Sequence, residues 1–99
     1  MEFATSKSGA RIVLTDERWR HIIQGHPEIT RRRAQVLGVI TNPNRVLQGG
    51  NDALMAIGRS GARGWLVVVY KEEGLSGFVI TAFRTTRSGS LDRRQQIWP

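Results

Sequence analysis

The chain has 99 residues, of which 15 are Lys or Arg and 8 are Asp or Glu, so its formal net charge is +7 at pH 7. This length predicts one domain with one modest hydrophobic core. Cysteine is absent, which excludes disulfide bonds and thiolate zinc sites. No segment approaches the roughly 20 apolar residues of a membrane-spanning helix, and the first residues lack the basic start and apolar core of a signal peptide. We therefore expect a cytoplasmic protein with no membrane partner.

Arginine dominates the positive charge, since only two of the 15 basic residues are Lys. The planar guanidinium group binds phosphate through paired hydrogen bonds and stacks on bases. An excess of basic residues is typical of proteins whose partner is a polyanion. RNA, or an acidic protein, is the expected partner, although a solvated Arg-rich surface without a partner has the same composition.

The N-terminal half predicts an arm, a strand and a first helix. Residues 1–10 are expected to form a flexible arm before a domain over residues 11–99, and residues 11–14 favour a short strand. Thr15 can cap a helix whose acidic first turn suits the positive helix end. This helix should end before Pro27, because the residue preceding a proline disfavours helical geometry.

A second helix is predicted to start at Pro27, with His26 as its N-cap. Its apolar residues face the core, and Arg31 lies on its wet side with the two arginines that follow. The segment Asn42-Pro43-Asn44 is expected to end it.

The C-terminal half predicts strands separated by short turns. They are expected at residues 46–48, 54–58, 65–70 and 78–84. Short connections favour antiparallel neighbours. The pattern therefore predicts an α+β fold, with N-terminal helices packed on one face of a four-stranded, possibly five-stranded, antiparallel sheet. The other face would be free to carry a site, and the closing Ile97-Trp98-Pro99 should dock on the body.

Both histidines lie close together in the sequence, and histidine exchanges protons near neutral pH. His21 points away from the apolar stripe of the first helix, towards solvent or a cleft. His26, as an N-cap, would lie at a positive helix end that suits phosphate, where Glu28 can orient its ring. The competing interpretation is that His26 only caps a helix and His21 is a surface residue.

Polar residues in and beside the last strands are candidates for phosphate contacts. Thr81 interrupts an apolar strand, and alternation places it on one face with Val79, Phe83 and Thr85. A threonine hydroxyl can contact phosphate or ribose, but threonine is also an ordinary strand residue. The cationic candidates are Lys71, Arg84, Arg63 and Arg31. Arg11 and Arg59 are further candidates, for which a solvated surface is the competing interpretation.

Metal-independent RNA cleavage needs a proton acceptor, a proton donor and cations near the phosphate. The chain offers these groups, and it lacks the carboxylate cluster of a metal nuclease, a glycine-rich phosphate loop and a cysteine nucleophile. Two histidines without a clear third ligand do not make a zinc site. We expect no metal and no cofactor.

Several segments of the chain together match a pattern seen in a known group of proteins. They are Trp19-x-His21-Ile22, His26-Pro27-Glu28, Ile40-x-Asn42-Pro43, residues 66–69, residues 78–83 and Ile97-Trp98-Pro99. In this order, over residues 11–99, they resemble small prokaryotic and phage proteins of the barnase–EndoU–colicin–RelE nuclease superfamily.

The resemblance implies helices packed on a four-stranded antiparallel sheet, and metal-independent ribonuclease activity, often as the toxin of a toxin–antitoxin pair. By position it implies that His21 and His26 are the histidines of the helical motif and that Thr81 is the strand threonine. The chain departs from RelE itself at the C-terminal end, because its only tyrosine is Tyr70.

The sequence therefore predicts a toxin-like endoribonuclease with His21, His26 and Thr81 as catalytic residues, RNA as substrate and an acidic antitoxin as partner. Two alternatives stay open. One is a non-catalytic RNA-binding module, which would bind RNA without cutting it. The other is a basic domain that docks an acidic protein.

Overall fold

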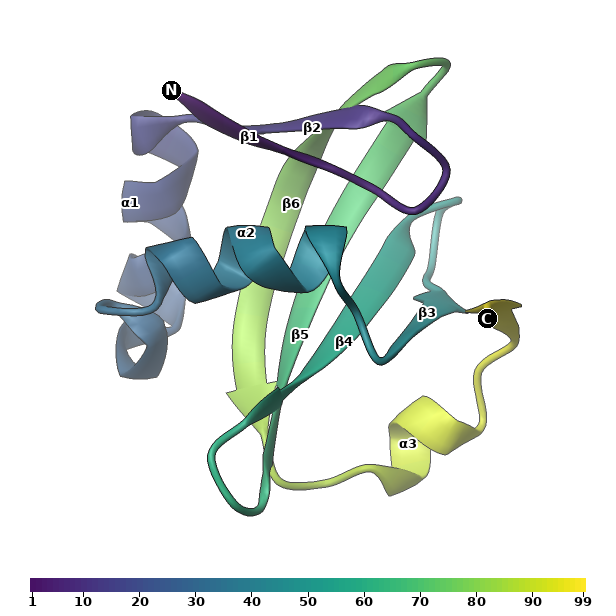
Figure 1. Ribbon diagram of the computed structural model, residues 1–99. Helices are drawn as coiled ribbons and strands as arrows, with labels where there is room; N and C mark the ends of the chain where they lie inside the picture. Colours follow the sequence, from purple (N-terminus) through teal and green to yellow (C-terminus); the bar gives the residue numbers. More distant parts are fainter.

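A computed structural model describes residues 1–99 as an α+β fold built on one seven-stranded mixed sheet (Figure 1). The strands are β1 (Glu2–Thr5), β2 (Arg11–Leu14), β3 (Arg45–Gln48), β4 (Leu54–Ser60), β5 (Gly64–Glu73), β6 (Ser76–Thr85) and β7 (Gln96–Trp98). The helices are α1 (Asp16–Gly25), the 3₁₀ helix η1 (Pro27–Ile29), α2 (Arg33–Thr41) and α3 (Gly89–Asp92). No helix is long and apolar enough to cross a membrane.

The sheet has the strand order β1-β2-β6-β5-β4-β3-β7. The four central strands β3 to β6 were predicted, and they pair antiparallel in an unbroken meander. The prediction of a four- or five-stranded, wholly antiparallel sheet is wrong. Strand β2 runs parallel to β6, and β7 adds to β3, so the sheet is larger and mixed. The docking of the C-terminal segment on the body is confirmed.

Residues 1–10 do not form the expected arm. Residues Glu2–Thr5 are β1, which pairs antiparallel with β2 and places Phe3 opposite Val13. Ala4 is buried in the core. This hairpin crosses the upper end of β5 and β6 in Figure 1.

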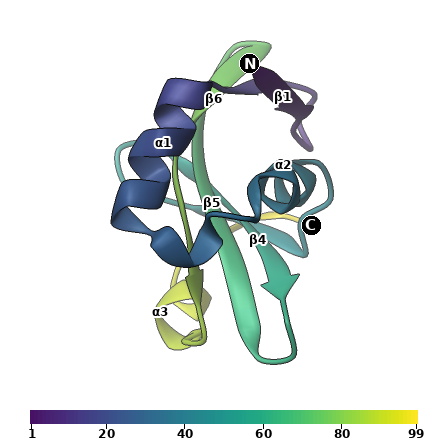
Figure 2. The ribbon, with the colours of Figure 1, turned by 90° about the vertical axis from the view of Figure 1, so that its left-hand side faces the viewer.

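The first helix follows its prediction. Thr15 Oγ1 accepts a hydrogen bond from the Arg18 backbone N–H at 3.0 Å, and Asp16 and Glu17 occupy the first turn. Trp19 and Ile22 are buried. α1 lies along β6, and α2 lies across β4 and β5 (Figures 1 and 2).

The second helix does not run from Pro27. The chain forms η1 and then starts α2 only at Arg33. At the break, the Thr30 hydroxyl donates to the Pro27 carbonyl at 2.7 Å, which is a local alternative to a helical backbone bond. His26 is the C-cap of α1 and, as an N-cap, precedes only the three-residue η1, where its side chain makes no capping bond. The predicted end of the second helix is confirmed, since Asn42 is its C-cap.

The core lies on both faces of the sheet. On the helix face, the largest cluster joins residues of α1 and α2 to Leu66, Val68, Tyr70, Val79 and Ala82. On the opposite face, Leu91 of α3 packs with a smaller cluster of strand residues. The expectation that this second face is free therefore holds only beyond α3.

Candidate functional site

His26 and Glu28 come together where α1 gives way to η1. The turn at Pro27 brings their side chains to the same side, with His26 Nδ1 3.7 Å from Glu28 Oε2. The two side chains are 38% and 43% exposed. An imidazole and a carboxylate at this separation form a pair that can hold and pass a proton at a surface that solvent and a large substrate can reach.

Strand β6 supplies the wall of this site. Because β2 pairs only with Ser76 to Phe78, the rest of β6 keeps a free edge, and η1 lies against it. The Phe83 ring lies 5.8 Å from the His26 ring, centroid to centroid, with a tilt of 34°. The Arg84 backbone N–H donates to Glu28 Oε2 at 3.5 Å. Two consecutive residues of β6 therefore position the pair, Phe83 at His26 and Arg84 at Glu28.

The Arg84 side chain turns into the fold instead of outwards. Its Nη2 donates to the Ser60 carbonyl at 3.0 Å, and a Cβ on residue 64 would collide with its guanidinium. Gly64 therefore makes the room that Arg84 occupies. The Arg84 Nε and the Ser60 Oγ are buried without a partner in the chain. Arg84 is thus a half-buried cation whose guanidinium is held at Ser60, and only its backbone N–H contacts the His26–Glu28 pair.

Thr81 lies on the β6 face that carries Phe83, two residues away, and it is half-buried. This spacing corresponds to about 7 Å along a strand. The predicted alternation fails one residue earlier. Val69 pairs with Thr81 but Tyr70 pairs with Val79, so Ile80 is an extra residue and Val79 turns to the buried helix face. A bulge of this kind shifts the side-chain register by one.

His21 is not brought to His26. It lies on the exposed surface of α1 and lines a hollow with other polar residues of that helix, including Thr15, Arg18 and Gln24. His26 does not border this hollow. Five residues of helix separate the two histidines, which is about 140° of rotation. The hollow that His21 lines is therefore separate from the His26 site.

The cationic candidates are spread over the molecule. Arg31 borders a shallow hollow that Glu28 also lines, and Arg63 is exposed in the turn between β4 and β5, near the end of β5 that meets Thr85. Lys71 pairs with Phe78 near the other end of β5. Val67 is the residue of β5 that lies opposite Phe83, and Lys71 is four residues further along, which is about 13 Å of strand, so Lys71 is not part of the His26 site.

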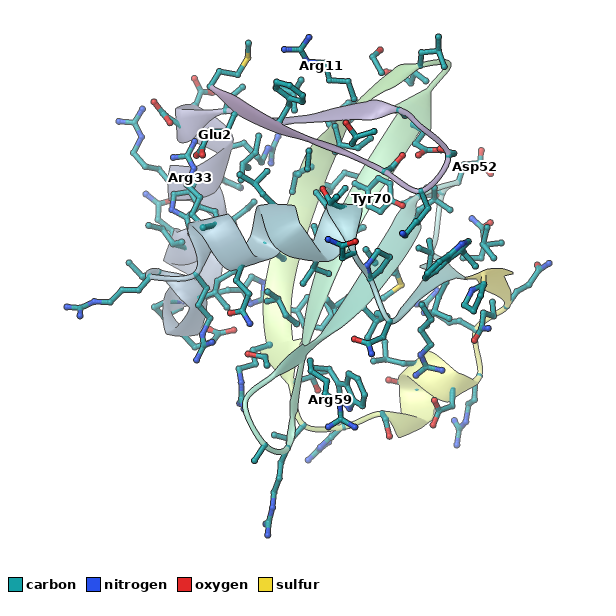
Figure 3. The ribbon with its side chains drawn as sticks, viewed as in Figure 1. Glu2, Arg11, Arg33, Asp52, Arg59 and Tyr70 are labelled. Carbon is teal, nitrogen blue, oxygen red and sulfur yellow. The ribbon has the colours of Figure 1, made fainter.

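One residue of this region, Phe83, was not predicted as a site residue, and Arg59 was predicted only as a candidate phosphate contact. Phe83 was placed with Thr81 by alternation, but no local signal showed that His26 would pack beside it. Arg59, labelled in Figure 3, has its guanidinium carbon 5.1 Å from the centre of the Trp65 ring. The half-buried Trp65 also pairs with Thr85 across β5 and β6. An arginine on an aromatic ring at a sheet surface suits contact with an RNA base.

No group of three or more His, Asp or Glu side chains is placed as a metal ion would need. Comparison with family models, with curated proteins and with solved structures finds no match for this chain.

Proposed function

We propose that the chain is a metal-independent endoribonuclease in which the His26–Glu28 pair transfers the protons. The observation that carries this proposal is the pair itself: Nδ1 and Oε2 are 3.7 Å apart at a half-exposed edge, in a chain of net charge +7. The fold and the net charge affect only how RNA reaches and binds the protein, whereas the pair supplies the groups that would transfer protons.

The reaction that fits the pair is attack of a ribose 2′-oxygen on its own 3′-phosphate. The Glu28 carboxylate accepts the 2′-OH proton as the new P–O bond forms. The P–O5′ bond breaks, and protonated His26 donates its proton to the departing 5′-oxygen. The products are a 2′,3′-cyclic phosphate and a 5′-hydroxyl, so protons and charge balance. Each proton transfer of this type typically contributes a factor of about 10² to 10⁴ to the rate.

The residues around the pair supply the remaining needs of the reaction. Phosphate gains negative charge in the transition state, and a cation held in place stabilises that charge. Arg31 is an exposed cation in the hollow that Glu28 also lines, and Arg84, whose guanidinium is held at Ser60, adds positive charge from β6. Arg31 and Arg63 are exposed enough to contact neighbouring phosphates, and the Thr81 hydroxyl can contact the ribose or phosphate next to Phe83.

The test is incubation of the purified protein with total RNA and EDTA, followed by analysis of the fragment ends. We expect cleavage with 2′,3′-cyclic phosphate ends. His26→Ala and Glu28→Gln should each lower the rate at least 100-fold, which is the low end for loss of an acid or base. His21→Ala is the matched control and should cut RNA at nearly the wild-type rate.

Several outcomes would contradict the proposal. Cleavage that survives both His26→Ala and Glu28→Gln would show that this pair is not the acid–base machinery. RNA that is bound but left intact would instead establish a non-catalytic RNA-binding module. The stack of Arg59 on Trp65 is the feature that favours this second candidate.

A ribonuclease of this type would act in the cytoplasm as a toxin and would need an acidic inhibitor protein. The surface that suits such a partner is a row of side chains across three strands, in which Phe3 pairs with Val13 and Val13 with Phe78. Phe3 is 49% and Phe78 42% exposed, and the Arg11 guanidinium lies 3.7 Å from the Phe3 ring centre. We expect Phe78→Ser combined with Arg11→Glu to abolish inhibition by an acidic antitoxin while RNA cleavage continues. Unchanged inhibition would rule this surface out.

A further inference from the structure

A second hollow, of about 220 Å³, opens on the helix face of the sheet at the end remote from Arg84. Its floor is formed by paired strands: Leu54 lies opposite Tyr70, and Val46 lies opposite Trp98. The loop between β1 and β2, with Lys7 and Ser8, borders it from the hairpin side. Tyr70, labelled in Figure 3, lies behind this loop. None of the residues at the His26 site takes part.

The Tyr70 side chain gives this hollow a polar atom that lacks a partner. The residue is only 2% exposed and belongs to the main core, yet it also lines the hollow. Its hydroxyl makes no hydrogen bond within the chain. The hydroxyl is not one of the buried side-chain atoms without a partner, so it is open to the hollow and free to donate to a ligand there. Burial and the neighbouring Glu72 charge raise the pKa of Tyr70 to about 12, which keeps the hydroxyl protonated and able to donate.

Glu72 lies two residues beyond Tyr70 on β5 and also lines the hollow. Its Oε2 accepts hydrogen bonds from the hydroxyls of Ser6 and Ser8, which fixes the carboxylate against the loop. Oε1 makes no hydrogen bond within the chain and remains an acceptor. The hollow therefore presents a donor on Tyr70 and an acceptor on Glu72 from the same strand face.

The remaining walls are apolar and aromatic. Val46, Leu54 and Ile97 line the hollow with the Trp98 ring. Lys7 Nζ lies 4.7 Å from the centre of that ring, so the nearby positive charge is already engaged. A flat ligand with apolar faces is favoured over an anion, because the polar groups of the hollow form one hydrogen-bonding edge.

We propose that this hollow binds a nucleobase, either of a free nucleoside or of a nucleotide within an RNA strand. A base is planar, has apolar faces that suit the Val46, Leu54 and Ile97 walls, and carries ring or carbonyl acceptors beside amino or imino donors. The Tyr70 hydroxyl donates to an acceptor of the base edge, and Glu72 Oε1 accepts from a neighbouring N–H. The volume suits one base, because pockets for larger, drug-sized ligands measure about 300–1,000 Å³. This proposal does not depend on RNA cleavage at His26.

The test is titration of the ¹⁵N-labelled protein with each of the four ribonucleosides, followed by NMR. We expect at least one to give saturable shifts of the Trp98 indole N–H and of the Lys7 and Ser8 amides, with Kd on the order of 1 mM, as suits a small ligand. The His26 and Phe83 signals should not move. Tyr70→Phe and Glu72→Gln should each weaken binding about tenfold, which is the loss expected for one hydrogen bond of about 1.4 kcal/mol.

Tyr70→Phe keeps the ring that fills the core, so it should fold, and an unchanged amide spectrum elsewhere would verify this. A second titration uses 2′-O-methyl tetranucleotides, which cannot be cut by 2′-oxygen attack. It distinguishes a base within an RNA strand from the base of a free nucleoside. Tighter binding than the nucleoside at the same signals identifies a base of an RNA strand, and equal or weaker binding identifies a free nucleoside. The proposal is overturned if no nucleoside or tetranucleotide shifts these signals, or if Tyr70→Phe and Glu72→Gln bind as tightly as the wild type.

Discussion

At the scale of single residues, two glycines differ in what a methyl group would meet. On the buried side of β4, a Cβ at Gly58 would lie 2.6 Å from Val39 Cγ2, and α2 packs here against the sheet. Gly38, one residue earlier than Val39 in the exposed part of α2, has nothing within 4 Å. The same substitution should therefore have opposite effects at the two positions.

We expect Gly58→Ala to lower the free energy of unfolding by about 1–3 kcal/mol, the usual cost of overpacking a core. Gly38→Ala should raise it by up to about 1 kcal/mol, because alanine favours a helix interior. Urea denaturation of the two variants checks both signs. Equal stability of Gly58→Ala and the wild type would mean that Val39 or α2 moves away without cost.

The His26 site also shows, residue by residue, what local sequence can predict. The proximity of His26 and Glu28 follows from their spacing of two across a proline turn. The inward course of Arg84 could not be predicted, because its anchor at Ser60 lies on another strand and the space depends on Gly64. The position of Val79 was wrong because a bulge at Ile80 leaves no clear signal in an apolar run.

At the scale of elements, the start of α1 depends on one hydroxyl. Thr15 Oγ1 satisfies the Arg18 backbone N–H, which would otherwise lack a partner in the first turn. We expect Thr15→Ala to destabilise the protein by about 1 kcal/mol and Thr15→Ser to restore most of the loss. Thr86→Ala, at an exposed residue without a side-chain hydrogen bond, is the control for urea denaturation. Equal loss in both alanine variants would exclude a specific cap.

Arg33, at the first residue of α2, joins three elements. Its Nη2 lies 2.7 Å from Asp16 Oδ1 in α1, and its Nε lies 2.7 Å from Glu2 Oε1 in β1, at ion-pair distance although not aligned as a hydrogen bond (Figure 3). The hydrogen bond and the charge of Arg33 hold the pKa of Asp16 below its ordinary value of 3.8.

This shift gives a pH dependence with a definite sign. A carboxyl whose pKa is lower in the folded state stabilises the fold above its unfolded pKa, and this contribution disappears as the pH falls through the folded value. We expect the wild type to melt at a higher temperature than Asp16→Asn at pH 6, and the gap to close below the ordinary pKa of 3.8. Glu73→Gln, at an exposed carboxyl without an ion pair, should show no such closing gap. If the difference in melting temperature between the wild type and Asp16→Asn stays constant with pH, the Arg33 contact does not contribute to the loss of stability in acid.

The elements that sequence predicted are those with local signals, such as the Thr15 cap and the tight turns between β3, β4, β5 and β6. Strand β7 and the parallel pairing of β2 with β6 were missed because they depend on distant segments, and β1 was missed although it pairs with the neighbouring β2. Val13 and Phe78 are adjacent in the sheet but 65 residues apart in the chain. No periodicity in β1 or β7, which have four and three residues, could identify their partners.

At the scale of the whole molecule, the distribution of charge decides how RNA would approach. Arg59 and Arg63 are exposed near the start of β5, where Trp65 pairs with Arg59 of β4 and with Thr85 of β6. This end of the sheet is close to the edge that carries His26. Arg18 and Arg20 line the separate hollow on α1. The net charge of +7 attracts RNA to the molecule as a whole, but only arginines that contact phosphates release counterions on binding.

We therefore expect log Kd for single-stranded RNA to rise linearly with the logarithm of the salt concentration. The slope is set by the number of these phosphate contacts. Removing two phosphate contacts changes the slope by about 1.4, at about 0.7 per phosphate for single strands. Arg59→Gln with Arg63→Gln should produce this change, measured by fluorescence anisotropy with a 2′-O-methyl oligonucleotide. Arg18→Gln with Arg20→Gln removes the same formal charge and should leave the slope unchanged. If the α1 pair lowers the slope and the β4–β5 pair does not, the RNA follows α1, and the His26 edge is not where its backbone is held.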